Sequence, residues 1–477
     1  MSLQTKQIIL SHKNATPPTN LILTKKSNVT FLGHLICYDK TQQALYLLEK
    51  GENFMSEFDK IIGYDSIKYE LNRVCEVLKN FEKYERLGAR QPTGLLLYGP
   101  TGVGKSLMAN CFIKQSGWNV FVCRKDKPDE AFVNEIKNIY ENAKNNQPAI
   151  VFLDDMDKFS ETDLFGPTDT DEFITIQSCI DDAKDKKIFT LATANSIKFP
   201  ESLIRAGRFD KSIKINKPKG DDCKKIIQYY LSQKKHIANL DIDEISKILD
   251  NSSCAELELV INDAAIYAGE QNKTEIDTDD IIKSCMRVLF EAPESLANKE
   301  EKYIERLAYH EAGHAVVREV LKPNSINLLS VCKHEGDIGG VTSCSPFDGM
   351  SYKTKATENS IVCFLGGKAA TELIYGEIDL GATSDTNIAY IMTETLLINY
   401  LNCGFQYINE NYDISEQKRS KIENKIADEL DRYYIQAKQI LAQNINFLHA
   451  LAKELVKHKT LRAKDIKQIK TKLNINI

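Results

Sequence analysis

The chain has 477 residues, of which 42% are hydrophobic and 27% are charged, a balance that is typical of folded domains and excludes a disordered chain. Its 62 Lys and Arg residues are matched by 67 Asp and Glu residues. The formal net charge of -5 therefore gives no general basic surface and argues against a nucleic-acid partner. A chain of this length is expected to form about two to four domains.

The twelve cysteines are scattered and none belongs to a CxxC pair, which indicates free thiols in a reducing compartment. No apolar stretch reaches the roughly 18 residues that a membrane-spanning helix needs. The N-terminus also lacks the apolar core and cleavage site of a secretory signal. We therefore expect a soluble, cytoplasmic protein without a membrane-spanning segment; peripheral attachment to a membrane through a partner stays open.

The predicted elements change character along the chain. Apolar strands at 94–98, 149–153 and 188–192 alternate with helical segments, which predicts a parallel α/β sheet. Helical spacing follows, then a charged break at Pro293, then a mainly helical segment in which 326–348 predicts one or two strands. The predicted domains are an N-terminal segment without an assignable role (1–53), a large α/β subdomain (54–217), a helical lid (218–290), a linker (291–303) and a mainly helical domain (304–477).

A glycine-rich turn between an apolar strand and a helix has the pattern of a phosphate-binding loop. Its glycines let backbone N–H groups close around phosphates, Lys105 reaches the terminal phosphates and Ser106 offers a hydroxyl to magnesium. The predicted nucleotide-binding residues of the loop are Gly99, Pro100, Thr101, Gly102, Val103, Gly104, Lys105 and Ser106.

Polar residues at the ends of the following strands complete the predicted nucleotide site. Asp154 is the expected magnesium carboxylate, and Asp155 is the candidate base that orients the attacking water. Asn195 either positions the same water or is a simple turn residue. Arg205 and Arg208 suit a charge-stabilising finger for a neighbouring subunit's phosphate, although alone they are equally well explained as surface residues or salt-bridge partners.

Residues 310–314 read His-Glu-Ala-Gly-His and open an apolar helical run. Histidines four residues apart lie on one face of a helix, so His310 and His314 can bind one zinc ion while Glu311 activates its water. A catalytic zinc site needs a third protein ligand. Chemistry alone leaves six candidates for it: His334, Asp337, Glu358, Glu372, Glu377 and Asp385.

The order of these motifs resembles the FtsH family of AAA proteases (peptidase family M41). The resemblance covers nearly everything after residue 54. Besides the phosphate loop, it is carried by the segments 58–65, 78–90, 192–195, 204–210, 309–314, 365–376 and 381–385. It implies an AAA ATPase module, with a parallel sheet and a helical lid, followed by a mainly α-helical zinc metallopeptidase domain.

The same resemblance implies an ATP-dependent zinc endopeptidase, generally a homohexamer, that unfolds and degrades unfolded or misassembled polypeptides. Its cofactors would be Zn²⁺ and ATP with Mg²⁺. The family's aspartate ligand matches Asp385, 71 residues after His314. By the same transfer, Arg205 and Arg208 would act on a neighbouring subunit.

Several positions depart from the family pattern. The family's N-terminal transmembrane helices are not found, and the usual Asp-Glu pair is Asp154-Asp155 here. Phe132 falls where the family has a substrate-gripping aromatic, in a loop shortened by about four residues, so it either grips substrate or packs in a helix. Cys254 replaces a usual glycine of the lid, and the segment around Gly404 replaces the family's Gly-Met-Ser.

Two other functions compete with ATP-dependent proteolysis. One is an unfoldase or assembly chaperone whose peptidase is little used, and the other is a peptidase with a degenerate motor. In the leading hypothesis, the segment 338–343 provides a strand edge that holds the substrate beside the zinc.

Overall fold

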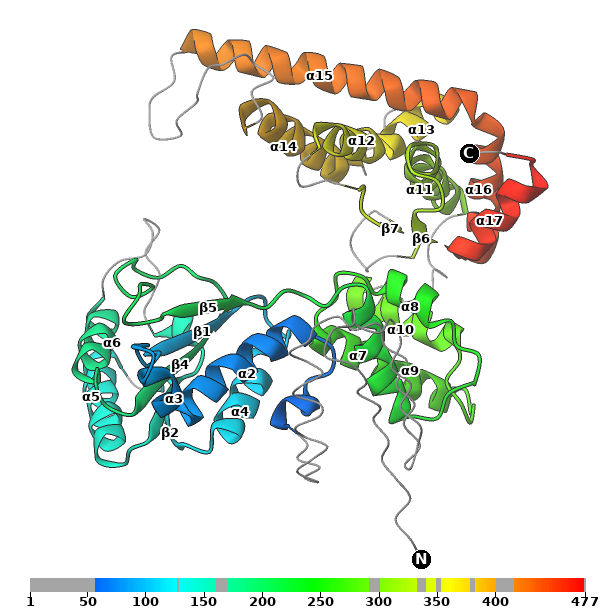
Figure 1. Cartoon of the computed structure of the whole chain (residues 1–477). Helices are drawn as coiled ribbons and strands as arrows, with labels where there is room; N and C mark the ends of the chain where they lie inside the picture. The colour runs from blue at the N-terminus through cyan, green and yellow to red at the C-terminus, as the bar shows by residue number, and fades with distance from the viewer. Residues whose placement is uncertain are drawn as a thin grey trace, which may run out of the picture. The chain divides into compact units, whose positions relative to one another are not determined.

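The structure is a computed structural model, and it describes residues 56–126, 128–159, 170–290, 301–332, 340–348, 353–377, 382–399 and 416–475 (Figure 1). Across these ranges, no helix combines the length and the apolar character needed to cross a membrane. The sequence expectations for residues 1–53, His334, Asp337, Ile338 and the segment around Gly404 fall outside the described residues.

A five-stranded sheet forms the centre of the first module, as the sequence predicts. All its pairings are parallel and the strand order is β2-β3-β4-β1-β5. The three central strands are apolar and almost wholly buried because helices cover both faces of the sheet. The strands are β1 (Gly94–Tyr98), β2 (Asn119–Cys123), β3 (Ala149–Leu153), β4 (Ile188–Ala194) and β5 (Lys211–Lys214).

Two adjacent residues of β4, Ile188 and Phe189, show which helices cover each face of the sheet. Ile188 belongs to a core cluster with residues of α5 and α6, whereas Phe189, which points the other way, stacks on Phe112 of α4 with ring centroids 5.6 Å apart. The sheet is therefore a middle layer between helices. The helical elements of this subdomain are η1 (Glu57–Lys60), α2 (Asp65–Lys79), α3 (Phe81–Glu85), α4 (Lys105–Ser116), α5 (Asp129–Asn145), η2 (Met156–Lys158) and α6 (Asp171–Asp182).

Four helices follow and form the lid: α7 (Asp221–Ser232), α8 (Ile242–Ile248), α9 (Cys254–Glu270) and α10 (Thr278–Phe290). Helix α9 begins at a capping box, in which the side chains of Ser253 and Glu256 each accept the other residue's backbone N–H. The first turn of α9 also contacts the phosphate loop, because the Ala255 N–H donates to the Gly102 carbonyl at 3.0 Å.

The C-terminal domain packs helices around α11 (Glu301–Leu321). Gly313 of α11 lies so close to α13 that a Cβ there would lie 2.5 Å from Cβ of Ala370. The glycine of the His-Glu-Ala-Gly-His motif therefore permits this helix crossing. The other helices are α12 (Thr354–Phe364), α13 (Gly366–Tyr375), α14 (Thr383–Asn399), α15 (Glu416–Gln443), α16 (Ile445–His458) and α17 (Ala463–Lys472).

A three-stranded antiparallel sheet lies in the same domain, with strand order β7-β6-β8. Strands β6 (Ile326–Ser330) and β7 (Val341–Cys344) occur within the predicted segment, and β8 (Thr460–Arg462) is an additional strand that the sequence analysis missed. All five residues of β6 are buried, since β6 is paired on both sides.

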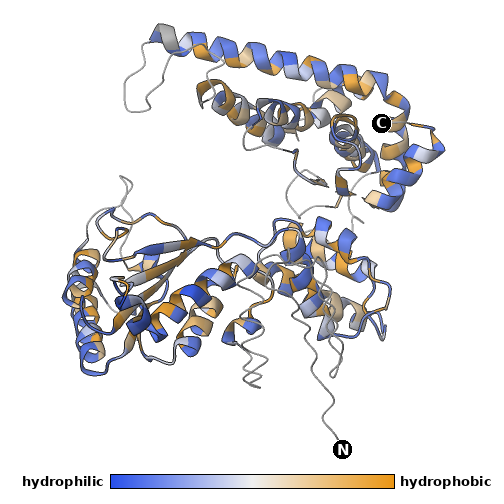
Figure 2. Ribbon diagram, in the orientation of Figure 1, coloured by the Kyte–Doolittle hydropathy of each residue, from blue (hydrophilic) through white to orange (hydrophobic). Residues whose placement is uncertain are grey.

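Helix α15 packs on the C-terminal domain through one apolar stripe. Polar and apolar residues alternate along it (Figure 2). Its buried side chains recur at helical spacing at Ile426, Tyr433, Ala437 and Leu441, and most of them join the core formed with α11 and α16. Burial of one apolar stripe therefore holds this helix on the domain.

Candidate metal and nucleotide sites

The two histidines of α11 meet an aspartate from the first turn of α14. His310 Nε2 lies 3.1 Å from His314 Nε2 and 3.1 Å from Asp385 Oδ2, and His314 Nε2 lies 3.3 Å from the same oxygen. Within the part of the chain that the structure describes, these three residues are the one group of metal-ligating side chains with converging donor atoms.

This arrangement fits a zinc ion. Zinc bound tetrahedrally through bonds of about 2.0–2.1 Å separates its ligand atoms by about 3.4 Å, close to the three separations here. Two imidazole nitrogens and one carboxylate oxygen are also zinc's usual donors and leave a fourth position for water. Gly367 keeps the space clear, because a Cβ there would lie 2.5 Å from Nε2 of both histidines.

A backbone carbonyl orients one of the histidine ligands, and the aspartate ligand is held in its ionised form beside both histidines. The Cys363 carbonyl lies 2.7 Å from Nδ1 of His314, which favours a proton on Nδ1 and leaves Nε2 for a metal. Although burial opposes ionisation, hydrogen bonds with both histidines hold the pKa of Asp385 far below its usual value. Burial likewise opposes the charged imidazole, but Asp385 raises the pKa of His314 to about 9. The carboxylate of Asp385 thus supplies negative charge beside both imidazoles.

The other described candidates for the third ligand have different partners. Glu372 accepts hydrogen bonds from Lys438 and Tyr434, and Glu358 lies beside Arg432 and Tyr433. Glu377 is paired with Arg306 at 3.4 Å. Of the candidates that the structure describes, only Asp385 therefore joins the histidines.

Glu311 follows His310 on α11 and is buried, with 5% of its surface exposed. Both of its carboxylate oxygens accept hydrogen bonds from the segment that forms β7. The Gly340 N–H donates to Oε1 at 3.1 Å and the Thr342 hydroxyl to Oε2 at 2.7 Å. The sequence analysis predicted the base but missed both donors.

Lys105, at the start of α4, has its ammonium group inside the phosphate loop. Its Nζ donates to the carbonyls of Gly99 and Pro100, both at 2.8 Å, and to Oδ1 of Asn195 at 2.9 Å. Gly104, the residue before α4, has φ 93°, a conformation that glycine adopts without strain. The predicted loop and Asn195 are therefore in direct contact.

The two carboxylates after β3 differ sharply in environment. Asp154 is buried and accepts hydrogen bonds from Arg124 at 2.7 and 2.9 Å and from the Thr193 hydroxyl at 2.8 Å. Asp155 is more exposed, adopts a left-handed backbone with φ 55° and pairs with Lys158 at 2.7 Å. Arg124 and Thr193 are contacts of the predicted magnesium carboxylate that the sequence analysis missed.

A third carboxylate fixes Asn195. Asp157 accepts the backbone N–H of Asn195 at 2.9 Å and its side-chain amide N–H at 2.8 Å. The amide oxygen of Asn195 is thereby turned toward Lys105. A signal for Asp157 was present in the sequence, since it stands three residues after Asp154, but spacing alone gave no reason to select it.

The two arginines predicted as fingers have different environments. Arg205 is exposed. Arg208 is buried and its guanidinium donates to Asp181 at 2.7 Å, to Gln177 at 2.6 Å and to the Ser202 carbonyl at 2.5 Å. These contacts make Arg208 a salt-bridge partner of Asp181 within this chain, and its role in a neighbouring subunit's site stays a prediction.

The structure describes two of the residues that depart from the family pattern, Phe132 and Cys254. Phe132 lies on α5 with 0% of its surface exposed and packs edge-to-face on Phe159, with centroids 4.9 Å apart, so it is a packing aromatic and not a gripping residue. Cys254 Sγ lies 3.6 Å from the Val103 carbonyl of the phosphate loop and 3.6 Å from the Tyr64 hydroxyl. The lid thus contacts the loop through this thiol.

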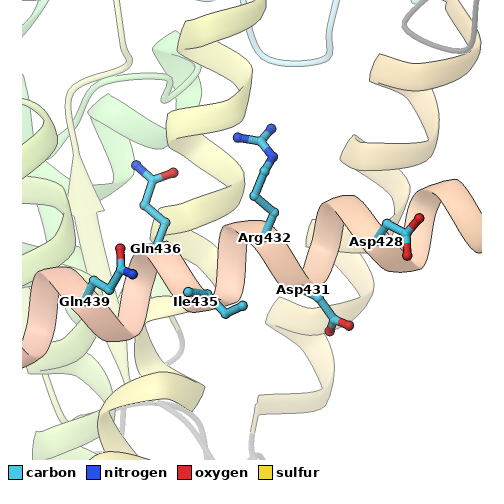
Figure 3. Close-up of a pocket in the computed structure, with 6 residues that line it drawn as sticks. All are labelled: Asp428, Asp431, Arg432, Ile435, Gln436 and Gln439. Atoms are coloured by element: carbon cyan, nitrogen blue, oxygen red, sulfur yellow. The ribbon is translucent and has the colours of Figure 1, made fainter.

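A surface hollow along α15 shares no residue with either site (Figure 3). Asp428, Asp431, Arg432, Ile435, Gln436 and Gln439 line it, all from this one helix. Arg432 is paired with Glu429 at 2.6 Å. The hollow contains no group of converging metal ligands and no phosphate-binding turn, so we assign it no chemistry.

The fold and the two sites together define a class of protein, an AAA ATPase module joined to a His-Glu-x-x-His metallopeptidase domain. Residues 95–217 match the model of the ATPase family associated with various cellular activities (AAA). Residues 295–469 match the model of peptidase family M41.

Curated relatives are similar to the chain over most of its length. The ATP-dependent zinc metalloprotease FtsH of Bacillus subtilis is 30% identical over 463 residues, which cover 91% of this chain and 72% of the relative. That of Aster yellows witches'-broom phytoplasma is 30% identical over 86% of this chain, and the chloroplastic FTSH protein of Capsicum annuum is 29% identical over 84%. The chain spans 63% and 65% of the lengths of these two relatives.

The chain therefore belongs to the FtsH family of ATP-dependent zinc metalloproteases. The cofactors of this class are zinc and ATP with magnesium.

Proposed function

We propose that this chain is an ATP-dependent zinc metalloendopeptidase that unfolds polypeptides and degrades them. One observation carries the proposal: donor atoms of His310, His314 and Asp385 converge within 3.3 Å of one another, and the buried Glu311 directly follows His310 on the same helix. This set has the three ligands and the base that hydrolysis of a peptide bond at zinc requires.

In the peptidase site, His310, His314 and Asp385 would hold zinc. When bound, zinc supplies Lewis-acid polarisation of the substrate carbonyl and lowers the pKa of a water. Glu311 accepts the proton of the attacking water and passes it to the leaving amine. Its burial excludes bulk water, which strengthens its hydrogen bonds.

In the motor, Lys105 would exchange its contacts with Gly99, Pro100 and Asn195 for oxygens of the terminal phosphates. Asp154 and Ser106 would hold magnesium, while Asp155 and Asn195 would orient the attacking water. We assign the trans-acting finger to Arg205, which is exposed, and a supporting role to Arg208, whose contacts fix the same segment.

We further propose a homohexamer that acts on unfolded or misassembled polypeptides, with the domain limits 54–217, 218–290 and 304–477 predicted from the sequence. The finger role proposed for Arg205 requires such a ring, because it acts on a neighbouring subunit's phosphate. The cytoplasmic location stays a prediction from the sequence.

Casein cleavage by three proteins tests the proposal. With Mg–ATP, we expect the wild type to cut casein. Glu311→Gln should bind zinc and hydrolyse ATP but should not cut casein. Lys105→Ala should bind zinc but should neither hydrolyse ATP nor cut casein rapidly. Glu305→Gln is a matched control, since Glu305 is an exposed residue of the same helix as Glu311. Cutting by Glu311→Gln at the wild-type rate would refute the assignment of the base.

A further inference from the structure

Strand β7 contacts the carboxylate of Glu311 directly. The Thr342 hydroxyl donates to Oε2 and the Gly340 N–H, one residue before the strand, donates to Oε1. Gly340 donates through its backbone and Thr342 through its side chain, and the two residues are separated by one position. The carboxylate is therefore held at two points from a single stretch of backbone.

Gly340 has a spatial reason to be glycine. A Cβ at this position would lie 2.5 Å from Cγ and 2.7 Å from Cδ of Glu311, and it would also clash with the Ser330 carbonyl. Distances this short require the carboxylate or the strand to move. The absence of a side chain thus lets the backbone N–H of residue 340 reach Oε1.

The segment is itself fixed to the domain core. Val341 pairs with Ser330 and Thr342 pairs with Leu329 in the antiparallel ladder between β7 and β6. Strand β6 is buried along its whole length and is also paired with β8. The position of β7 therefore bears on the carboxylate of Glu311 through two hydrogen bonds, in addition to the backbone of α11 that carries Glu311 and the histidines.

We propose that Thr342 and Gly340 are positioning residues for Glu311: they fix the rotation of its carboxylate relative to the ligands on α11. The proposal rests on the proposed peptidase function. A carboxylate oxygen has two lone pairs, so each oxygen of Glu311 keeps one for the water whose proton it accepts. Fixing the plane of the carboxylate aims those remaining lone pairs, and misplacement of a reacting group by about 1 Å can cost a hundredfold in rate.

A merely structural role would have a different signature. A buried carboxylate needs hydrogen-bond donors, so loss of the Thr342 hydroxyl could only destabilise the domain and reduce zinc binding and substrate binding together. A positioning role predicts that the turnover number falls while zinc content and KM stay the same. The two roles are therefore separable by measurement.

The test compares Thr342→Val, which keeps the shape and removes the hydroxyl, with Thr342→Ser, which keeps the hydroxyl. Ser343→Ala is the matched control, on the neighbouring residue of the same strand. In the full chain with Mg–ATP, we expect Thr342→Val to lower kcat for casein by about tenfold to a hundredfold, the range for loss of a hydrogen bond to a charged group. Its KM, ATP turnover and one zinc per chain should stay at wild-type values, and Thr342→Ser should recover most of kcat.

A second measurement does not depend on turnover. Acetohydroxamate chelates zinc and donates a hydrogen bond to a neighbouring carboxylate, so its affinity for the zinc-loaded chain reports the position of Glu311. We expect calorimetric titration to give weaker binding for Thr342→Val, about tenfold, and near-normal binding for Thr342→Ser and Ser343→Ala.

The outcomes separate this proposal from the proposed function. Unchanged kcat and hydroxamate affinity in Thr342→Val would overturn the positioning role, and so would loss of zinc that Thr342→Ser does not restore. If the wild type binds zinc but cuts no casein, the proposed function fails, and the hydroxamate titration still decides whether Thr342 positions Glu311.

Discussion

The ammonium nitrogen of Lys105 donates a hydrogen bond of 2.9 Å to the side-chain oxygen of Asn195, 90 residues further along the chain. The bond joins the phosphate loop after β1 to the end of β4, two strands that are neighbours in the sheet. Asn195 in turn donates to Asp157 with both its backbone N–H and its amide. The loop lysine, the amide and the carboxylate thus form one chain of contacts across the predicted ATP site.

Asp157→Ala should lower ATP turnover by about tenfold or more while ATP binding is kept. The substitution removes both acceptors that hold Asn195, and loss of a hydrogen bond to a charged group costs about 1.5–3 kcal/mol. Turnover is measured by phosphate release and binding with a fluorescent ATP analogue. Asp126→Ala, at an exposed position of the same subdomain, is the control, and wild-type turnover in Asp157→Ala would contradict the prediction.

Arg208→Ala should destabilise the AAA module by about 2–4 kcal/mol. Its guanidinium is buried and donates to Asp181, Gln177 and the Ser202 carbonyl; removing it takes this donor from all three and leaves Asp181 with Lys184 alone. Urea unfolding gives the free energy of unfolding for comparison with Arg205→Ala. Because Arg205 is exposed, its removal should change that free energy by less than about 0.5 kcal/mol. Equal effects of the two substitutions would refute the difference in their roles.

The same pair predicts an acid dependence. Hydrogen bonding from Arg208, and to a smaller extent from Lys184, lowers the pKa of the Asp181 carboxyl to about 2. A carboxyl whose pKa is lower in the folded state stabilises the fold above its unfolded value and loses that contribution as the pH falls. The wild type should therefore lose stability between about pH 4 and pH 2 more steeply than Arg208→Ala. Parallel acid-unfolding curves for the two proteins would contradict this.

The sequence predicts chemistry well where a motif is local. The phosphate loop and the His-Glu-Ala-Gly-His motif each lie within eight consecutive residues. The spacing of apolar residues on either side predicts the strand and the helices that flank them. Asp385 is different, because nothing in its spacing of 71 residues from His314 favours it over Glu358 or Glu372. The family resemblance supplied that ligand, and only the packing of α14 against α12 and α15 brings it to the histidines.

What the sequence could not predict depends on burial and on distant partners. Arg205 and Arg208 read alike in the chain, yet one is exposed and the other is tied to Asp181. Phe132 left two interpretations open until its position in the core was known. Thr342 is an ordinary strand residue by composition, and its contact with Glu311 arises only because β7 pairs with β6 beside α11.

Asp155→Asn should abolish ATP turnover without changing stability. Asp155 has φ 55°, and Asn tolerates this left-handed backbone as well as Asp does, so the free energy of unfolding should stay within about 0.5 kcal/mol. Its ion pair with Lys158 is exposed and contributes little. The control is Lys158→Ala, which should keep turnover. Normal turnover in Asp155→Asn would remove Asp155 from the role of base.

Removal of zinc should destabilise the C-terminal domain and leave the AAA module unchanged. A ligand that binds only the folded state stabilises it by about 2.7 kcal/mol at a hundred times its Kd, and the three ligand atoms come together only when α11 and α14 pack. The chelator 1,10-phenanthroline should lower the Tm of one of the transitions recorded by calorimetry, and excess zinc should restore that Tm. His314→Ala is the control, because a chain that cannot complete the site should show the lower Tm with or without the chelator. A Tm that the chelator lowers equally in His314→Ala would mean that the stabilising metal binds elsewhere.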